Sequence, residues 1–86
     1  MSYKLIILPR AEKELKKLPQ KEFLKVDETI LQLANEPRPA GCKKLQGIED
    51  TYRVRVGDYR ILYRIEDTQL IIEVIRIANR KDAYKL

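Results

Sequence analysis

The stretch Tyr-Arg-Val-Arg-Val-Gly-Asp-Tyr-Arg-Ile-Leu-Tyr-Arg-Ile, residues 52 to 65, decides the fold of this chain. Apolar and arginine side chains alternate before and after Gly57-Asp58, which is the period-two pattern of half-buried strands. Glycine at the first position of a two-residue turn accepts the positive φ that such a turn needs. The stretch therefore predicts an antiparallel hairpin with strands at 52–56 and 59–65.

The predicted turn also assigns each side chain of the hairpin to a face of the sheet. It places Val56 opposite Tyr59 and Arg55 opposite Arg60. The apolar side chains then share the face that should meet the helices: Tyr52, Val54, Val56, Tyr59, Ile61, Tyr63 and Ile65. The arginines share the other face: Arg53, Arg55, Arg60 and Arg64.

The pairing of Arg55 with Arg60 suggests a function for the arginine face. Like charges directly opposite each other destabilise a sheet, so a hairpin selected only for stability would avoid this pair. An anionic ligand on that face would explain it, because arginine offers a planar fork of donors that matches phosphate oxygens. The alternative is an ordinary solvated sheet surface, on which alternating arginines are common.

Helices are expected before the hairpin. Residues 3–8 are apolar and β-forming and read as a strand, and Pro9 starts a helix that Pro19 ends. A second helix is predicted from about Gln20 to Asn35, before the prolines of the next segment. The residues of the helical stripes are Ala11, Leu15 and Leu18 in the first helix and Phe23, Val26, Ile30, Leu33 and Ala34 in the second.

The segments flanking the hairpin complete the fold. Pro37 to Asp50 contains prolines and glycines and is predicted to be a loop, with Lys43 and Lys44 exposed and Leu45 and Ile48 turned inward. Leu70 to Ala78 is almost continuously apolar and is typical of a central strand. Continuing the meander puts Glu73 on the arginine face, where it can pair with an arginine.

The expected fold class is α+β, in a single domain spanning residues 1–86. The predicted order is an N-terminal strand, a two-helix hairpin and an antiparallel three-strand meander, with the helices packed on one sheet face. The opposite face is then left for function.

Composition narrows the classes of function. The net charge of +5 favours a polyanionic partner, and six of the eight basic residues between positions 51 and 86 are arginine. The chain has no histidine and a single cysteine, Cys42, so neither a metal site, another cofactor nor a disulfide is expected. The apolar runs are too short for a membrane span, and we expect a cytoplasmic protein.

Four segments of the chain resemble the RelE/ParE toxin superfamily. They are Leu-Pro-Arg-Ala-Glu-Lys-Glu-Leu-Lys-Lys-Leu-Pro at 8–19, Lys-Leu-Gln-Gly at 44–47, the hairpin at 52–63 and Ile-Ala-Asn-Arg-Lys-Asp-Ala-Tyr at 77–84. The resemblance covers essentially the whole chain in order, and its most specific part is Arg-x-Gly-Asp-Tyr-Arg-x-x-Tyr within the hairpin.

The resemblance implies a toxin of a type II toxin-antitoxin system, and most closely a RelE-like mRNA interferase. Such enzymes cleave mRNA at the ribosomal A site through attack of a ribose 2′-hydroxyl on the adjacent phosphate. The implied catalytic residues are Arg53, Arg55, Arg60, Arg80 and Tyr84. The expected substrate-binding residues are Arg64, Lys81, Lys43 and Lys44.

Two departures from the family pattern concern proton transfer. Many relatives have histidine where this chain has Asn79, and others have lysine where it has Arg55. Arginine is a poor general base because its guanidinium stays protonated. Catalysis would then depend on electrostatic stabilisation, with Tyr84, Lys81 or a ribosomal group handling protons.

The resemblance also implies partners and leaves alternatives open. The expected partners are a RelB-like antitoxin, the ribosome and mRNA, with operator DNA reached only through the antitoxin complex. One alternative is a ParE-like toxin that inhibits DNA gyrase without cutting nucleic acid. Another is a nucleic-acid-binding module without catalysis.

Overall fold

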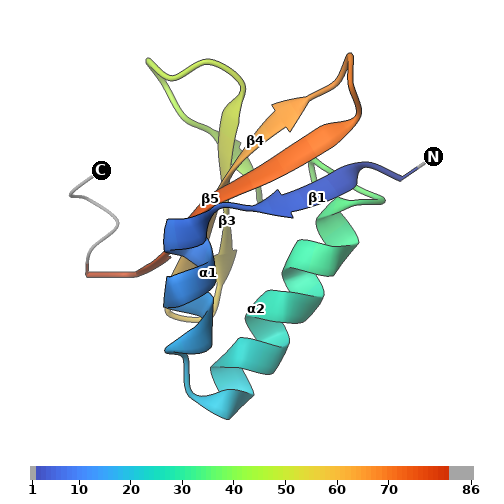
Figure 1. The fold of residues 1–86 in the computed structure, drawn as a ribbon. Helices are drawn as coiled ribbons and strands as arrows, with labels where there is room; N and C mark the ends of the chain where they lie inside the picture. The colour runs from blue at the N-terminus through green and yellow to red at the C-terminus, as the bar shows by residue number, and fades with distance from the viewer. Residues whose placement is uncertain (1, 82–86) are drawn as a thin grey trace.

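The computed structural model describes residues 2–81 and shows a mixed sheet with two helices packed on one face (Figure 1). The sheet has five strands in the order β1-β5-β4-β3-β2. The elements in chain order are β1 (Lys4–Ile7), α1 (Pro9–Lys16), α2 (Gln20–Leu33), β2 (Lys43–Lys44), β3 (Thr51–Val56), β4 (Tyr59–Glu66) and β5 (Ile71–Asn79). The predicted α+β class and the order of its main elements are confirmed.

The helices begin and end close to where the sequence predicts. Pro9 occupies the first turn of α1, where its missing N–H costs no hydrogen bond. The second helix ends at Leu33, slightly before the predicted Asn35. Neither helix in the described part of the chain is long and apolar enough to cross a bilayer. Their apolar stripes pack on the sheet and form one core with it: Ala11, Leu15, Val26, Ile30, Leu33, Val54, Ile61, Tyr63, Ile65, Ile72, Val74 and Ile77.

The hairpin of β3 and β4 has the predicted register. Val56 pairs with Tyr59 and Arg55 with Arg60, and Gly57 has a φ of +58° in the turn. The apolar face of this hairpin contributes to the core with the helices, as expected. Farther along the meander, Glu73 lies opposite Arg64, which confirms its predicted place on the arginine face.

The sheet is wider than the predicted meander. β1 pairs in parallel with β5, so β5 lies between β1 and β4 as a central strand. The β4–β5 ladder shifts register next to Leu62 and Tyr63, which marks a β-bulge. Hydrophobic patterning finds strands, but the partner of an N-terminal strand depends on how the helices return the chain to the sheet.

Helix α1 protects the part of β5 that β1 does not cover. The last bond at the β1 side is Leu8 N–H to the Val74 carbonyl, at 3.0 Å. Beyond it, one carboxylate oxygen of Glu14 accepts from the Ile77 N–H at 2.8 Å and the other from Arg76 Nη2, also at 2.8 Å. A side chain of α1 thus satisfies a strand edge that would otherwise be open to another chain.

The predicted loop at 37–50 differs from expectation in two details. Lys43 and Lys44 form the short strand β2 on the edge of β3, although both side chains are exposed as predicted. Leu45 is partly buried, but Ile48 is 52% exposed, so the prediction that it turns inward is wrong. Ile48 lies in a tight turn between Gly47 and Asp50, both of positive φ, which carries it away from the core.

Candidate functional site

A cavity of about 340 Å³ opens on the arginine face. It is lined by Ala40, Gly41, Lys43, Arg53, Val54, Arg55 and Arg60. We call it the arginine pocket. Three of the arginines predicted to share this face therefore line one concave site.

Three segments position the basic side chains of the arginine pocket. Arg53 and Arg55 lie two residues apart on β3, so both point to the same face. Arg60 reaches that face from β4 because it pairs with Arg55. Lys43 joins them from β2, where it pairs with Arg53. The site thus depends on the hairpin turn and on the loop that carries β2.

The charge of the arginine pocket is of one sign. Its lining within residues 2–81 contains four basic side chains and no carboxylate. Arg60 is only 5% exposed, although arginine is seldom so deeply buried on an ordinary solvated sheet surface. Arg55 is exposed beside it. A concave site of this composition suits an anion with several oxygen acceptors, such as a phosphodiester, which guanidinium forks bind through paired hydrogen bonds.

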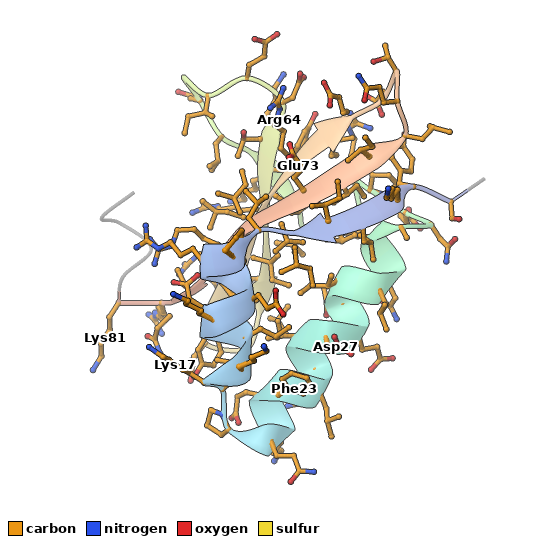
Figure 2. All side chains as sticks on the ribbon, in the orientation of Figure 1. Lys17, Phe23, Asp27, Arg64, Glu73 and Lys81 are labelled. Carbon is orange, nitrogen blue, oxygen red and sulfur yellow. The ribbon has the colours of Figure 1, made fainter. Side chains whose placement is uncertain are left out.

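Arg64 shares the arginine face by register but lies outside the pocket. Its guanidinium is 3.7 Å from a carboxylate oxygen of Glu66 and 3.7 Å from one of Glu73. Figure 2 shows Arg64 beside Glu73, well away from Lys81. Its charge is therefore matched by carboxylates of β4 and β5.

The other predicted site residues are distributed at the edges of the sheet. Lys44 pairs with Tyr52 and is the next residue after Lys43 on β2. Neighbouring residues of a strand point to opposite faces, and Lys44 is not part of the pocket lining. Arg80 and Lys81 line a separate hollow with Asp58 and Asn79. Tyr84 lies outside the described residues.

Arg80 nevertheless follows β5 at the pocket end of the sheet. Its N–H donates to the Asp58 carbonyl at 2.7 Å, which holds the chain against the hairpin turn. It comes directly after Asn79, whose side-chain oxygen accepts from the Lys81 N–H at 3.1 Å. Ala78 of β5 pairs with Arg60 of the pocket, and Arg80 follows Ala78 by two positions.

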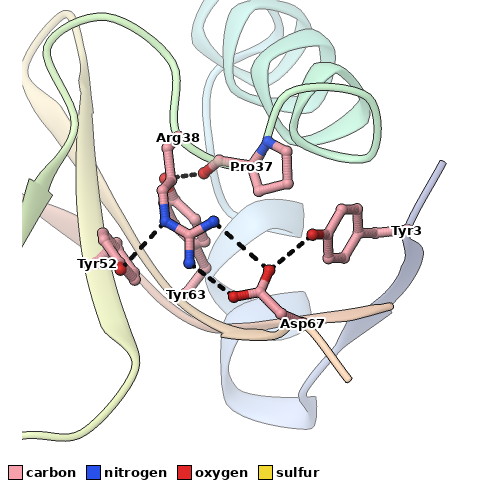
Figure 3. A network of polar contacts seen from close by, with 6 residues as sticks. All are labelled: Tyr3, Pro37, Arg38, Tyr52, Tyr63 and Asp67. Atoms are coloured by element: carbon pink, nitrogen blue, oxygen red, sulfur yellow. Dashed lines mark hydrogen bonds and ion pairs between the residues drawn. The ribbon is translucent and has the colours of Figure 1, made fainter. Parts of the chain in front are cut away.

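A polar network that the sequence analysis missed lies at the start of the loop before β2 (Figure 3). Arg38 Nη2 donates to Asp67 Oδ2 at 2.9 Å, and Arg38 Nε donates to the Tyr52 hydroxyl at 3.2 Å. Tyr3 donates to Asp67 Oδ1 at 2.7 Å. We call these contacts the Arg38–Asp67 network. Nearby, the buried Tyr63 hydroxyl donates to the Pro37 carbonyl at 2.7 Å.

The network shifts the titration of its members. The hydrogen bond from Arg38, followed by that from Tyr3, lowers the pKa of Asp67, and the bond to Asp67 raises the pKa of Tyr3. Burial raises the pKa of Tyr63. One signal in the sequence could have pointed to Arg38, since it stands between Pro37 and Pro39. Prolines restrict both their own backbone and that of the preceding residue, so they present an intervening side chain from a stiff segment.

No group of three or more acidic or cysteine side chains that could hold a metal ion is found within residues 2–81. The site is thus built from cationic side chains on a sheet face opposite the helices. These features define a small α+β domain with a pocket lined by cationic side chains.

Comparison with known proteins identifies the family. Residues 5–84 match the family described as the ParE toxin of type II toxin-antitoxin systems, parDE. The chain belongs to this RelE/ParE family of toxins.

Individual relatives are similar over nearly their whole length. The toxin RelE of Mycobacterium tuberculosis is 32% identical, with 98% of this chain and 88% of the relative covered. The mRNA interferase toxin RelE of Escherichia coli K12 is 28% identical, with 94% and 86% covered. The archaeal RelE in the RelE–RelB complex of Pyrococcus horikoshii OT3 has a TM-score of 0.84 at 31% identity, covering 96% of this chain and all of that one.

Proposed function

We propose that this toxin is a ribosome-dependent mRNA endoribonuclease that cleaves mRNA at the A site and so inhibits translation. The observation that carries the proposal is the arginine pocket, in which Arg53, Arg55, Arg60 and Lys43 line one cavity without a carboxylate among its described lining. A relative named as an mRNA interferase, similar over most of both chains, supports the same reading.

The pocket suits the charge that develops during RNA cleavage. When a ribose 2′-hydroxyl attacks the adjacent phosphate, negative charge accumulates on the phosphorane oxygens. Cationic donors already fixed at that position stabilise the transition state more than the ground state. In this proposal the buried Arg60 binds the scissile phosphate, and Arg53 and Arg55 stabilise the developing charge from β3.

Proton transfer needs groups other than these arginines, because guanidinium does not act as a base at ordinary pH. Arg80 and Tyr84 are proposed to complete the site from the segment after β5, with Arg80 on the phosphate and Tyr84 on the substrate base. Lys81, Tyr84 or a ribosomal group would handle protons. Lys44 and Arg64 are proposed to contact substrate outside the pocket.

The proposal includes an antitoxin partner in the cytoplasm. Related toxins have been solved in RelB–RelE complexes, including those of Pyrococcus horikoshii OT3 and Escherichia coli. A RelB-like antitoxin would neutralise this toxin, and operator DNA would be reached only through their complex. A pocket lined by cationic side chains favours an antitoxin segment that carries carboxylates.

The test is translation of a defined mRNA in a purified ribosomal system, with 5′ ends mapped by primer extension. New ends inside A-site codons are expected only when ribosomes are present. The variant Arg55→Ala should lose about a hundredfold in cleavage rate, because it removes a donor to the transition-state charge. The matched control is Arg10→Ala, which removes the same charge from an exposed position on α1, away from the arginine face.

A second candidate follows from the ParE description of the matched family. A ParE-like toxin would leave mRNA intact and inhibit DNA gyrase, with the arginine face used as a protein-binding surface. Intact mRNA in the ribosomal system, together with inhibition of supercoiling by purified gyrase, would contradict the interferase proposal and favour this one.

A further inference from the structure

The Arg38–Asp67 network joins four parts of the chain that are distant in sequence. Tyr3 precedes β1, Arg38 follows α2, Tyr52 lies on β3 and Asp67 lies in the turn between β4 and β5. The Arg38 guanidinium also lies over the ring of Tyr52, with its central carbon 5.1 Å from the ring centre. A single side chain thus holds the start of the loop against the sheet.

This anchor lies at one end of the segment that walls the arginine pocket. Ala40, Gly41 and Lys43 come from the loop and from β2 and line the pocket. The other end of the segment is fixed where Lys43 pairs with Arg53 and Lys44 with Tyr52. Tyr52 therefore takes part in both attachments, since it accepts from Arg38 and pairs with Lys44.

The network is separate from the hydrophobic core. The side chain of Arg38 is 45% exposed and that of Asp67 is 55% exposed. Exposed ion pairs contribute little to global stability, so the fold as a whole does not depend on this one. Its geometry has a local consequence instead, because two donors of the Arg38 guanidinium reach the two oxygens of Asp67 and so restrict where the start of the loop can lie.

We propose that Arg38 and Asp67 are positioning residues for the arginine pocket. They hold residues 39–44 so that Lys43 and the Gly41 backbone form its outer wall against Arg53. This inference rests on the proposed function, because it concerns how that pocket receives RNA. It adds two residues that are not among those lining the pocket.

The decisive variant is Asp67→Ala, for which charge and positioning predict opposite results. Removing a carboxylate makes the protein more positive, which by itself strengthens attraction to RNA. Loss of the anchor instead frees the pocket wall and weakens productive binding. The matched control is Glu28→Ala, which changes the charge equally at an exposed position on α2.

The measurements are ribosome-dependent cleavage, amide hydrogen exchange and thermal unfolding. For Asp67→Ala, the toxin concentration giving half-maximal cleavage should rise about tenfold, while the maximal rate falls only about twofold, because the pocket arginines remain on their strands. Amide exchange of residues 40–44 should accelerate about tenfold. The melting temperature should stay close to that of Glu28→Ala.

Each result separates this inference from the proposed function. A wild-type protein that cuts no mRNA overturns the proposed function, and hydrogen exchange still tests the anchor. Unchanged exchange of residues 40–44 in Asp67→Ala overturns the inference. So does accelerated exchange with an unchanged half-maximal concentration, because the wall would then be irrelevant to binding.

Discussion

The arginine pocket and the Arg38–Asp67 network use the same side chain in opposite ways, although Tyr52 of the network directly precedes Arg53 of the pocket. In the network, a carboxylate lies 2.9 Å from the guanidinium. In the pocket, Arg55 pairs across the strands with Arg60, and the described lining offers no carboxylate. In the first setting an arginine binds a carboxylate of the protein, and in the second several cationic side chains line one cavity.

This contrast separates the arginines of the described residues into two groups. Arg38, Arg64 and Arg76 each contact a carboxylate of another segment or strand. The contacts of Arg38 and Arg76 are short, at 2.9 and 2.8 Å, and leave little capacity for a ligand. The pocket arginines gather like charge at some cost in stability, which a bound anion would offset.

The largest expected effect on stability comes from removing Glu14, the carboxylate that binds Arg76. Glu14→Ala should lower the free energy of unfolding by about 2 to 3 kcal/mol, because it leaves the Arg76 charge, only 12% exposed, without its partner. The Ile77 N–H loses its acceptor as well. Urea unfolding checks this prediction. The control is Glu12→Ala, which breaks the exposed ion pair between Glu12 and Lys16 on the same helix. Equal midpoints for the two variants would contradict the distinction between the settings.

The next effect tests whether the pocket uses arginine for its shape as well as its charge. Arg60→Lys keeps the charge but replaces a planar fork by a single ammonium, so ribosome-dependent cleavage should fall about tenfold. Arg10→Lys, at an exposed position on α1 away from the arginine face, is the matched control. If both variants cleave like the wild type, the pocket acts only through net charge.

The third variant, Arg55→Thr, should raise stability slightly and lower cleavage activity. Arg55→Thr removes the like-charge pair with Arg60 and places a β-branched residue on an exposed strand, so the free energy of unfolding should rise by about 0.5 kcal/mol. Cleavage should fall in the same variant. Arg64→Thr, which loses contacts to Glu66 and Glu73, should show no such gain. Chemical denaturation and the cleavage assay together check both signs.

The smallest effect is the pH dependence of the network. The pKa of Asp67 lies below its ordinary value of 3.8 in the folded protein, so its ion pair stabilises the fold above that pH and is lost as pH falls through the folded pKa. The difference in urea midpoint between wild type and Asp67→Ala should be constant near neutral pH and disappear in acid. A difference that persists well below the folded pKa would show that the carboxylate charge is not responsible.

The hairpin shows how much of the site could be predicted from local pattern. A two-residue turn beginning with Gly57 leaves one register, and that register fixes the facing of Arg53, Arg55 and Arg60. Lys43 joins them only because part of the loop at 37–50 pairs with β3 as β2. This strand has two residues, which are too few to show the alternation that predicts a strand. The roles of Arg80 and Tyr84 stay predictions, and Tyr84 lies outside the described residues.

The spacing of apolar, proline and glycine residues was enough to predict the α+β class, the two helices, the hairpin register and the arginine face, because these depend on short-range patterns. Three features became visible only in the folded chain: β1 pairs with β5, Glu14 binds the edge of β5 beside Arg76, and Arg38 contacts Asp67. These contacts join residues far apart in the chain: 29 positions separate Arg38 from Asp67, and 62 separate Glu14 from Arg76. Their partners are selected by how the helices and strands pack, and local spacing carries no record of that packing.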